Sequence, residues 1–254
     1  MYNLFISSAI MLSVAISGTL TGTVNFEGKT KKRKPIPMDS DPVCGKSHKD
    51  TKALSESFIV DKDQNLKNVL VWLEGVNYSG EVTKEPAVID QVGCIYKPHV
   101  QGVMKGQDVI IKNSDATLHN IHSMAKKNTQ FNFAMPKVVK EKKTNFDKLE
   151  EPFYIKCDVH PWMKTWVGVF DHPYFATTDD NGNYKIENIP PGEYNVIAWH
   201  EMDAKFEGFK KTGTVTIGEG NSELSFKMKR GKKHKYQLNL YNKCIDLKKE
   251  SIFY

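Results

Sequence analysis

The chain has 254 residues, enough for one large domain or two small ones with a substantial hydrophobic core. Its 39% hydrophobic and 26% charged residues are ordinary values for a globular protein. Nine Lys or Arg and two acidic residues lie from Lys227 onward, so the net charge of +6 belongs to the end of the chain and the remainder is almost neutral. We therefore predict no nucleic-acid partner, and we interpret residues 231–254 as a basic, loosely ordered tail that could touch an anionic surface.

The chain begins with an apolar run, MYNLFISSAIMLSVAISGTL, in which Ala15-Ile16-Ser17 is a small-x-small cleavage pattern. This predicts a signal peptide over residues 1–17 and an exported protein, periplasmic or membrane-associated. No Lys or Arg precedes the apolar run. An uncleaved N-terminal anchor, or a start upstream of this sequence, is therefore the alternative.

The segments that follow alternate apolar and polar residues and are separated by Gly, Asn and Pro, which predicts β-strands. In the second of them, Val69, Val71 and Leu73 are expected to face a core. The predicted strands lie within residues 18–29, 65–76, 106–115, 154–157, 166–172, 181–186, 192–201 and 213–229. No convincing amphipathic helix longer than two turns interrupts them, so the predicted fold class is all-β, with sandwich architecture.

The sequence contains four cysteines, and in an exported protein each needs a partner or a chemical role. Cys244 lies in the tail. Among the possible disulfides we favour the one between Cys44 and Cys94, which leaves the thiol of Cys157 free for a chemical role. A disulfide from Cys157 to Cys44 or Cys94 is the alternative.

A cluster of soft metal ligands occupies residues 157–163, CDVHPWM. Cys157, His160 and Met163 offer a thiolate, an imidazole and a thioether on one short loop, a set that suits copper better than magnesium, calcium or manganese. His119 in VIIKNSDATLHNIH supplies a second imidazole from upstream, with His122 on the same predicted strand as the alternative. Zinc, with Asp158 as a further ligand, is the competing metal.

These two segments together resemble the cupredoxins, the small blue copper proteins, and the ligand loop is most like that of amicyanin. The resemblance covers about 85 residues, roughly 86–172, and implies a Greek-key β-sandwich that holds one type 1 copper. It implies His119, Cys157 and His160 as ligands, with Met163 as a long axial ligand.

The same resemblance implies roles for the neighbouring residues. Asn113 fits the family pattern, Asn120 and Asp158 would link the two ligand segments by hydrogen bonds, and Pro161 would stiffen the loop. His160 would show an edge to solvent, and a redox partner would dock near His160 and Trp162.

The flanking segments resemble the carboxypeptidase regulatory-like, or transthyretin-like, sandwich. Asn181-Gly182 and Pro190-Pro191-Gly192 form the turns of its closing strands, and residues 18–29 resemble its opening strand. This places the first part of that module at residues 18–85, the cupredoxin domain at 86–172 and the remaining strands at 173–230.

The predicted function is therefore one-electron transfer between redox partners without catalysis, since no open metal position accompanies an acid–base pair. Copper delivery in the cell envelope and a structural envelope-binding module are the alternatives. His99 receives no assigned role.

Overall fold

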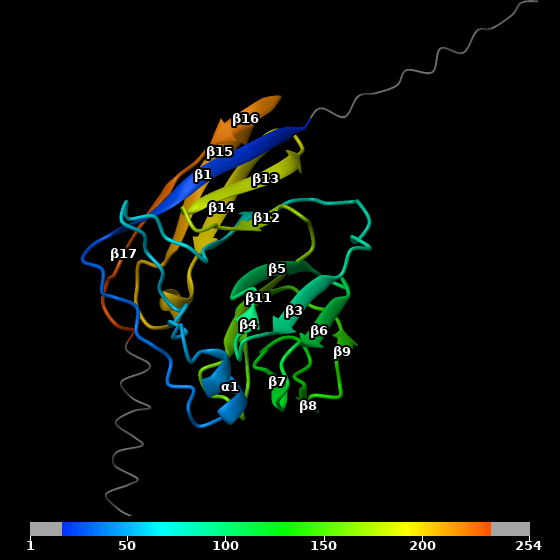
Figure 1. The fold of residues 1–254 in the computed structure, drawn as a ribbon. Helices are drawn as coiled ribbons and strands as arrows, with labels where there is room; N and C mark the ends of the chain where they lie inside the picture. Colours follow the sequence, from blue (N-terminus) through cyan, green and yellow to red (C-terminus); the bar gives the residue numbers. More distant parts are fainter. Residues whose placement is uncertain (1–16, 235–254) are drawn as a thin grey trace, which may run out of the picture.

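The computed structural model describes residues 17–234, so the predicted signal peptide and most of the basic tail lie outside the described residues. The described chain is almost entirely β and forms two β-sandwiches (Figure 1), as the sequence predicts. Among the described residues, no helix has the length and apolar character that crossing a membrane requires.

The first sandwich, here called the terminal sandwich, is built from strands near both ends of the described chain. One sheet contains β1 (Gly18–Glu27), β13 (Asn183–Ile189), β16 (Gly220–Glu223) and β17 (Phe226–Lys229). The other has the order β12 (Phe175–Thr177), β2 (Leu70–Glu74), β14 (Gly192–Trp199) and β15 (Lys210–Ile217). Nothing in the structure assigns this sandwich to the transthyretin-like family, so that resemblance stays a prediction.

The second sandwich, here called the inserted sandwich, is formed by the strands that lie between β2 and β12 in the chain. Its larger sheet has the order β5 (Val100–Met104), β11 (Lys164–Phe170), β10 (Glu150–Lys156), β7 (His119–Ser123) and β8 (Asn132–Met135). Its smaller sheet has the order β4 (Tyr96–Lys97), β3 (Ala87–Gln91), β6 (Val109–Asn113) and β9 (Glu141–Thr144). β5 pairs in parallel with β11, and β3 with β6, whereas the other pairs in these two sheets are antiparallel.

Strand β2 is buried on both faces, which explains how the two sandwiches stay together. Val69, Val71 and Leu73 face the core of the terminal sandwich, as predicted. The alternate residues of this segment, Leu70 and Trp72, belong instead to a third apolar cluster shared with β5, β11 and β14. Since successive side chains of a strand point to opposite faces, one strand can serve both contacts.

A polar contact reinforces this interface. The carboxylate of Glu201, in the short 3-10 helix η1 (Glu201–Ala204), lies 2.6 Å from Nε2 of His99 and accepts a 3.1 Å hydrogen bond from Nε1 of Trp166. Burial raises the pKa of Glu201, but its contacts with His99 and Trp166 outweigh burial and lower the pKa below 4.5. His99, which had no predicted role, therefore links the two sandwiches.

We expect Glu201→Gln to lower the free energy of unfolding by about 1–3 kcal/mol at neutral pH, because a buried charged acceptor is lost. A carboxyl whose pKa is lowered by folding stabilises the protein above its unfolded pKa, and this stabilisation disappears as the pH falls. The difference between wild type and variant should therefore shrink below about pH 4.5. Urea unfolding at several pH values measures it. Glu207→Gln, at an exposed position on the same connection, is the control and should have little effect.

A long connection between β1 and β2 crosses from one sandwich to the other. Backbone hydrogen bonds between Ile36 and Ala53 and between Lys34 and Ser55 close its base. The helix α1 (Pro42–Ser47) lies near its tip, beside the inserted sandwich (Figure 1). We call residues 36–53 the α1 loop.

Candidate metal centre

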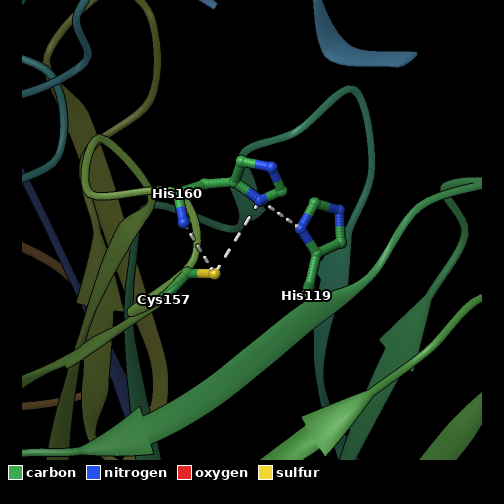
Figure 2. A group of neighbouring side chains, drawn as sticks. All are labelled: His119, Cys157 and His160. Carbon is green, nitrogen blue, oxygen red and sulfur yellow. Dashed lines mark hydrogen bonds between the residues drawn. The ribbon is translucent and has the colours of Figure 1, made fainter. Parts of the chain in front are cut away.

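Three predicted metal ligands meet at one end of the inserted sandwich. His119 is the first residue of β7, and Cys157 directly follows β10. Since β7 and β10 are antiparallel neighbours, with His122 opposite Lys156, the start of β7 lies beside the end of β10. His160 lies on the loop between β10 and β11, and Figure 2 shows the three side chains pointing toward one another.

The ligand atoms of these residues converge. Nδ1 of His119 lies 2.9 Å from Nδ1 of His160, and Sγ of Cys157 lies 3.9 Å from the same His160 nitrogen. The three side chains offer atoms that all lie within 4.8 Å of one another. The exposed fractions of His119, Cys157 and His160 are 0%, 1% and 2%, so the centre is closed to bulk solvent.

Backbone hydrogen bonds fix the loop that carries Cys157 and His160. The amide of Met163 donates to the carbonyl of His160 at 2.9 Å, and the amide of Cys157 donates to the carbonyl of Met163 at 3.2 Å. The sulfur of Cys157 accepts from the amides of His160, at 3.3 Å, and Asn120, at 3.5 Å. Met163 is buried at the end of this closed loop, and its role as axial ligand stays a prediction.

Each histidine is oriented by a carboxylate on its far nitrogen. Nε2 of His119 lies 2.9 Å from Oδ2 of Asp115, and Nε2 of His160 lies 3.1 Å from Oδ2 of Asp41. Burial raises the pKa of Asp41, but hydrogen bonds from Cys44, Thr117, His160 and Val43 outweigh it and lower the pKa to about 2. An ionised carboxylate only accepts hydrogen bonds, so Nε2 carries the proton on each ring and a neutral ring presents the lone pair of Nδ1 to the centre.

Two such lone pairs 2.9 Å apart repel unless a positive charge lies between them. In the metal-free protein a proton supplies that charge. Burial opposes it, but hydrogen bonds to Asp115 and Cys157 raise the pKa of His119 to about 9. Burial likewise opposes ionisation of Cys157, yet hydrogen bonds from His119 and from backbone amides lower the pKa of its thiol. The centre therefore favours a cation beside a thiolate, and two imidazoles with one thiolate suit copper or zinc.

Asn113 and Asn120 hold the surrounding backbone. The side-chain amide of Asn113 donates to the carbonyls of Thr117 and Met135, which shapes the turn leading into His119. Oδ1 of Asn120 accepts from the amide of Asp158, and its Nδ2 donates to the Asp158 carboxylate at 3.2 Å. The structure thus contains the expected link between the two ligand segments.

His122 and Asp158 take other partners. Nδ1 of His122 lies 2.8 Å from Oδ2 of Asp158, whereas Lys156 binds Oδ1 of the same carboxylate. His122 is three residues beyond His119 on β7, and alternation along a strand puts the two on opposite faces. The structure therefore brings His119, rather than His122, to Cys157, and it does not turn the Asp158 carboxylate toward the centre.

The expectation that His160 shows an edge to solvent is wrong. The α1 loop covers the ring: Asp41 contacts Nε2, and Sγ of Cys44 lies 3.7 Å from the same nitrogen. Trp162 is half-buried and donates from Nε1 to the carbonyl of Cys94 at 2.9 Å, whereas Pro161 stays exposed. The reason is an additional segment of chain over the ligand loop, which local sequence patterns did not place there.

A disulfide between Cys44 and Cys94 fastens the α1 loop to the inserted sandwich. It is the pair that the sequence analysis favoured, and Cys157 is the free cysteine of the described region. Met38 and the two half-cystines form a small apolar cluster against which Trp162 packs.

Sequence reasoning missed both carboxylates. Asp115 lies four residues before His119, within the segment that identified the ligand, so its spacing was a usable signal. Asp41 followed by Pro42 is a typical helix start, and Asp41 does cap α1 through the amides of Val43 and Cys44. That signal predicts the helix but gives no indication of the contact with His160, 119 residues away.

Comparisons with known proteins give structural matches only. No protein-family model and no curated protein matches the chain. A copper-containing nitrite reductase from Thermus scotoductus SA-01 matches at 20% identity and a TM-score of 0.30, over 38% of this chain and 25% of that one. A reduced amicyanin variant matches at 25% identity and 0.30, over 35% and 86%. A purple cupredoxin from Nitrosopumilus maritimus matches at 23% identity and 0.28, over 33% and 98%.

The chain thus spans about a quarter of the nitrite reductase that it matches. TM-scores of this size carry no argument about function. The proposed function therefore rests on the side chains at the centre.

Proposed function

We propose that this protein binds one copper ion through His119, Cys157 and His160, with Met163 as a weaker fourth ligand, and that it carries single electrons between redox proteins. The observation that carries the proposal is the convergence of two Nδ1 atoms and one thiol sulfur in a buried centre that favours a positive charge. When bound there, copper would supply a one-electron redox couple.

The protein side of the centre suits electron transfer because its ligand atoms are held in place. Asp115 and Asp41 fix the two imidazole rings, and backbone amides fix the sulfur of Cys157. When the ligand atoms keep the same positions in both oxidation states of the metal, each electron transfer requires little rearrangement of the protein. Its burial also excludes water from the ligand atoms, which supports a carrier over a hydrolytic enzyme and over a protein that releases its metal readily.

A redox partner is proposed to dock over the loops around His160 and Trp162. Three of the exposed large apolar side chains, Val43, Leu118 and Val159, each adjoin a residue of the centre or of the disulfide in the sequence. We propose these side chains as the apolar part of the docking surface, because exposed apolar patches mark protein-binding sites. The docking surface therefore includes the α1 loop as well as the ligand loop.

Export is proposed as well. The disulfide between Cys44 and Cys94 favours an oxidising compartment, because disulfides are rare in the reducing cytosol. The predicted signal peptide agrees with this, although residues 1–16 lie outside the described residues.

Addition of Cu(II) to the purified metal-free protein tests the proposal. We expect one equivalent to bind, an intense visible band from the cysteine thiolate, and a reversible one-electron wave in voltammetry. Zinc should bind without colour and serves as the control for the donor set. Binding of one copper without the visible band would contradict the proposed site, and rapid loss of Cu(I) to a competing chelator would favour copper delivery.

A further inference from the structure

The α1 loop brings a carboxylate to the metal centre from outside the inserted sandwich. Oδ1 of Asp41 accepts from the amides of Val43 and Cys44 at 2.7 and 3.1 Å. Its Oδ2 accepts from Oγ1 of Thr117 at 2.9 Å and lies 3.1 Å from Nε2 of His160. One carboxylate thus caps α1 and holds a ligand ring at the same time.

The disulfide connects this carboxylate to the one that holds the other histidine. Cys44 follows Asp41 by three residues, and its partner Cys94 donates its amide to Oδ2 of Asp115 at 2.8 Å. The amide of Gly93 donates to Oδ1 of Asp115 at 2.7 Å. The backbone amides of the two disulfide-bonded cysteines therefore each donate to one of the carboxylates that contact the histidines, Cys44 to Asp41 and Cys94 to Asp115.

Asp41 is the main partner available to Nε2 of His160. The ring is 2% exposed, so water does not replace the carboxylate readily. The disulfide sulfur of Cys44, at 3.7 Å, is a weak acceptor. Without the carboxylate, the imidazole would lose the contact that keeps Nδ1 directed at Cys157 and His119.

We propose that Asp41 is a positioning residue of the metal centre, which holds His160 with Nε2 protonated and places a negative charge one imidazole away from the bound metal. This rests on the proposed copper site. A carboxylate behind a ligating histidine makes the imidazole a stronger donor. Since Cu(II) carries more charge than Cu(I), Asp41 stabilises the oxidised state more and keeps the reduction potential low.

Asp41→Asn in the copper-loaded full chain tests the effect on the metal. Asparagine keeps the size of the side chain and, through its one oxygen, the cap of α1. Its NH2 group takes the place of Oδ2, so the variant removes both the charge and the acceptor that faces His160. We expect the ratio of the Cu(II) to the Cu(I) dissociation constant to rise about tenfold, which raises the reduction potential by about 59 mV for one electron.

The matched control is Asp39→Asn, which removes the same charge from an exposed position on the same loop. Its potential should stay near the wild-type value. An unchanged potential in Asp41→Asn, or equal shifts in both variants, would overturn the inference.

A second measurement uses the metal-free protein and separates this inference from the proposed function. The ¹⁵N chemical shifts of the His160 ring distinguish the Nε2–H from the Nδ1–H tautomer, and we expect Nε2–H in the wild type. An Nδ1–H ring would overturn the positioning role of Asp41 even if copper binds. Failure to bind copper together with an Nε2–H ring would overturn the proposed function and still support the orientation of His160 by Asp41.

Discussion

Replacing Cys157 with serine will abolish the intense visible absorption of the copper-loaded protein and lower its copper affinity by at least tenfold. The thiolate is the sole sulfur anion in the predicted ligand set, and a hydroxyl at the same position neither ionises near neutral pH nor gives sulfur-to-copper charge transfer. Cys157 is buried, and serine fits there without a clash because its hydroxyl is smaller than the thiol. Visible spectra and copper titrations of the two proteins measure both effects.

Cys244→Ser is the matched control, because it removes the remaining cysteine outside the disulfide and the centre. That variant should keep the full absorption and affinity. Retention of the band in Cys157→Ser would show that the copper ligands have been assigned wrongly.

The double variant Cys44→Ala/Cys94→Ala will lose roughly 2–4 kcal/mol of unfolding free energy, because the disulfide closes a loop with a sequence separation of 50 residues. We also expect faster alkylation of the Cys157 thiol in the metal-free protein. With the α1 loop no longer fastened, His160 loses its cover and reagents reach the buried sulfur more often. Chemical denaturation and iodoacetamide labelling in a Cys244→Ser background are the two measurements.

The outcomes of this experiment discriminate between two roles of the link. A loss of stability with unchanged labelling would mean that the α1 loop keeps its place over His160 without the disulfide. Faster labelling with unchanged stability would mean that the disulfide only holds the α1 loop over His160 and does not stabilise the fold. If neither quantity changes, the disulfide does not hold the loop against the centre.

These predictions concern a candidate metal centre that the inserted sandwich does not complete alone. The inserted sandwich supplies both imidazoles, the thiolate and Asp115, whereas the connection from the terminal sandwich supplies Asp41 and the cover over His160. The proposed redox partner would therefore meet the α1 loop as well as the ligand loop. Amino acid changes in this loop are expected to affect both partner docking and reduction potential.

Much of the fold was predictable because local alternation and turn residues specify strands. The alternation of Val69, Val71 and Leu73 predicted their core correctly. The same strand also carries Leu70 and Trp72, which pack against the inserted sandwich, and alternation by itself does not distinguish that contact from a strand with one exposed face. Short strands such as β4 have too few residues for a pattern.

The candidate ligands were predictable because residue type and spacing in the sequence indicate their chemistry. Cys157, His160 and Met163 lie on one loop, and a short antiparallel neighbour brings His119 to it. Only the tertiary structure decided that His160 is covered rather than exposed, and that Asp41 covers it. Asp41 and His160 lie 119 positions apart in the sequence, and the disulfide between Cys44 and Cys94 fastens the loop that carries Asp41 to the inserted sandwich. No local sequence pattern encodes a contact between segments so far apart. The sequence by itself thus determined which atoms can bind a metal, and the packing of distant segments determined their orientation, charge and access to solvent.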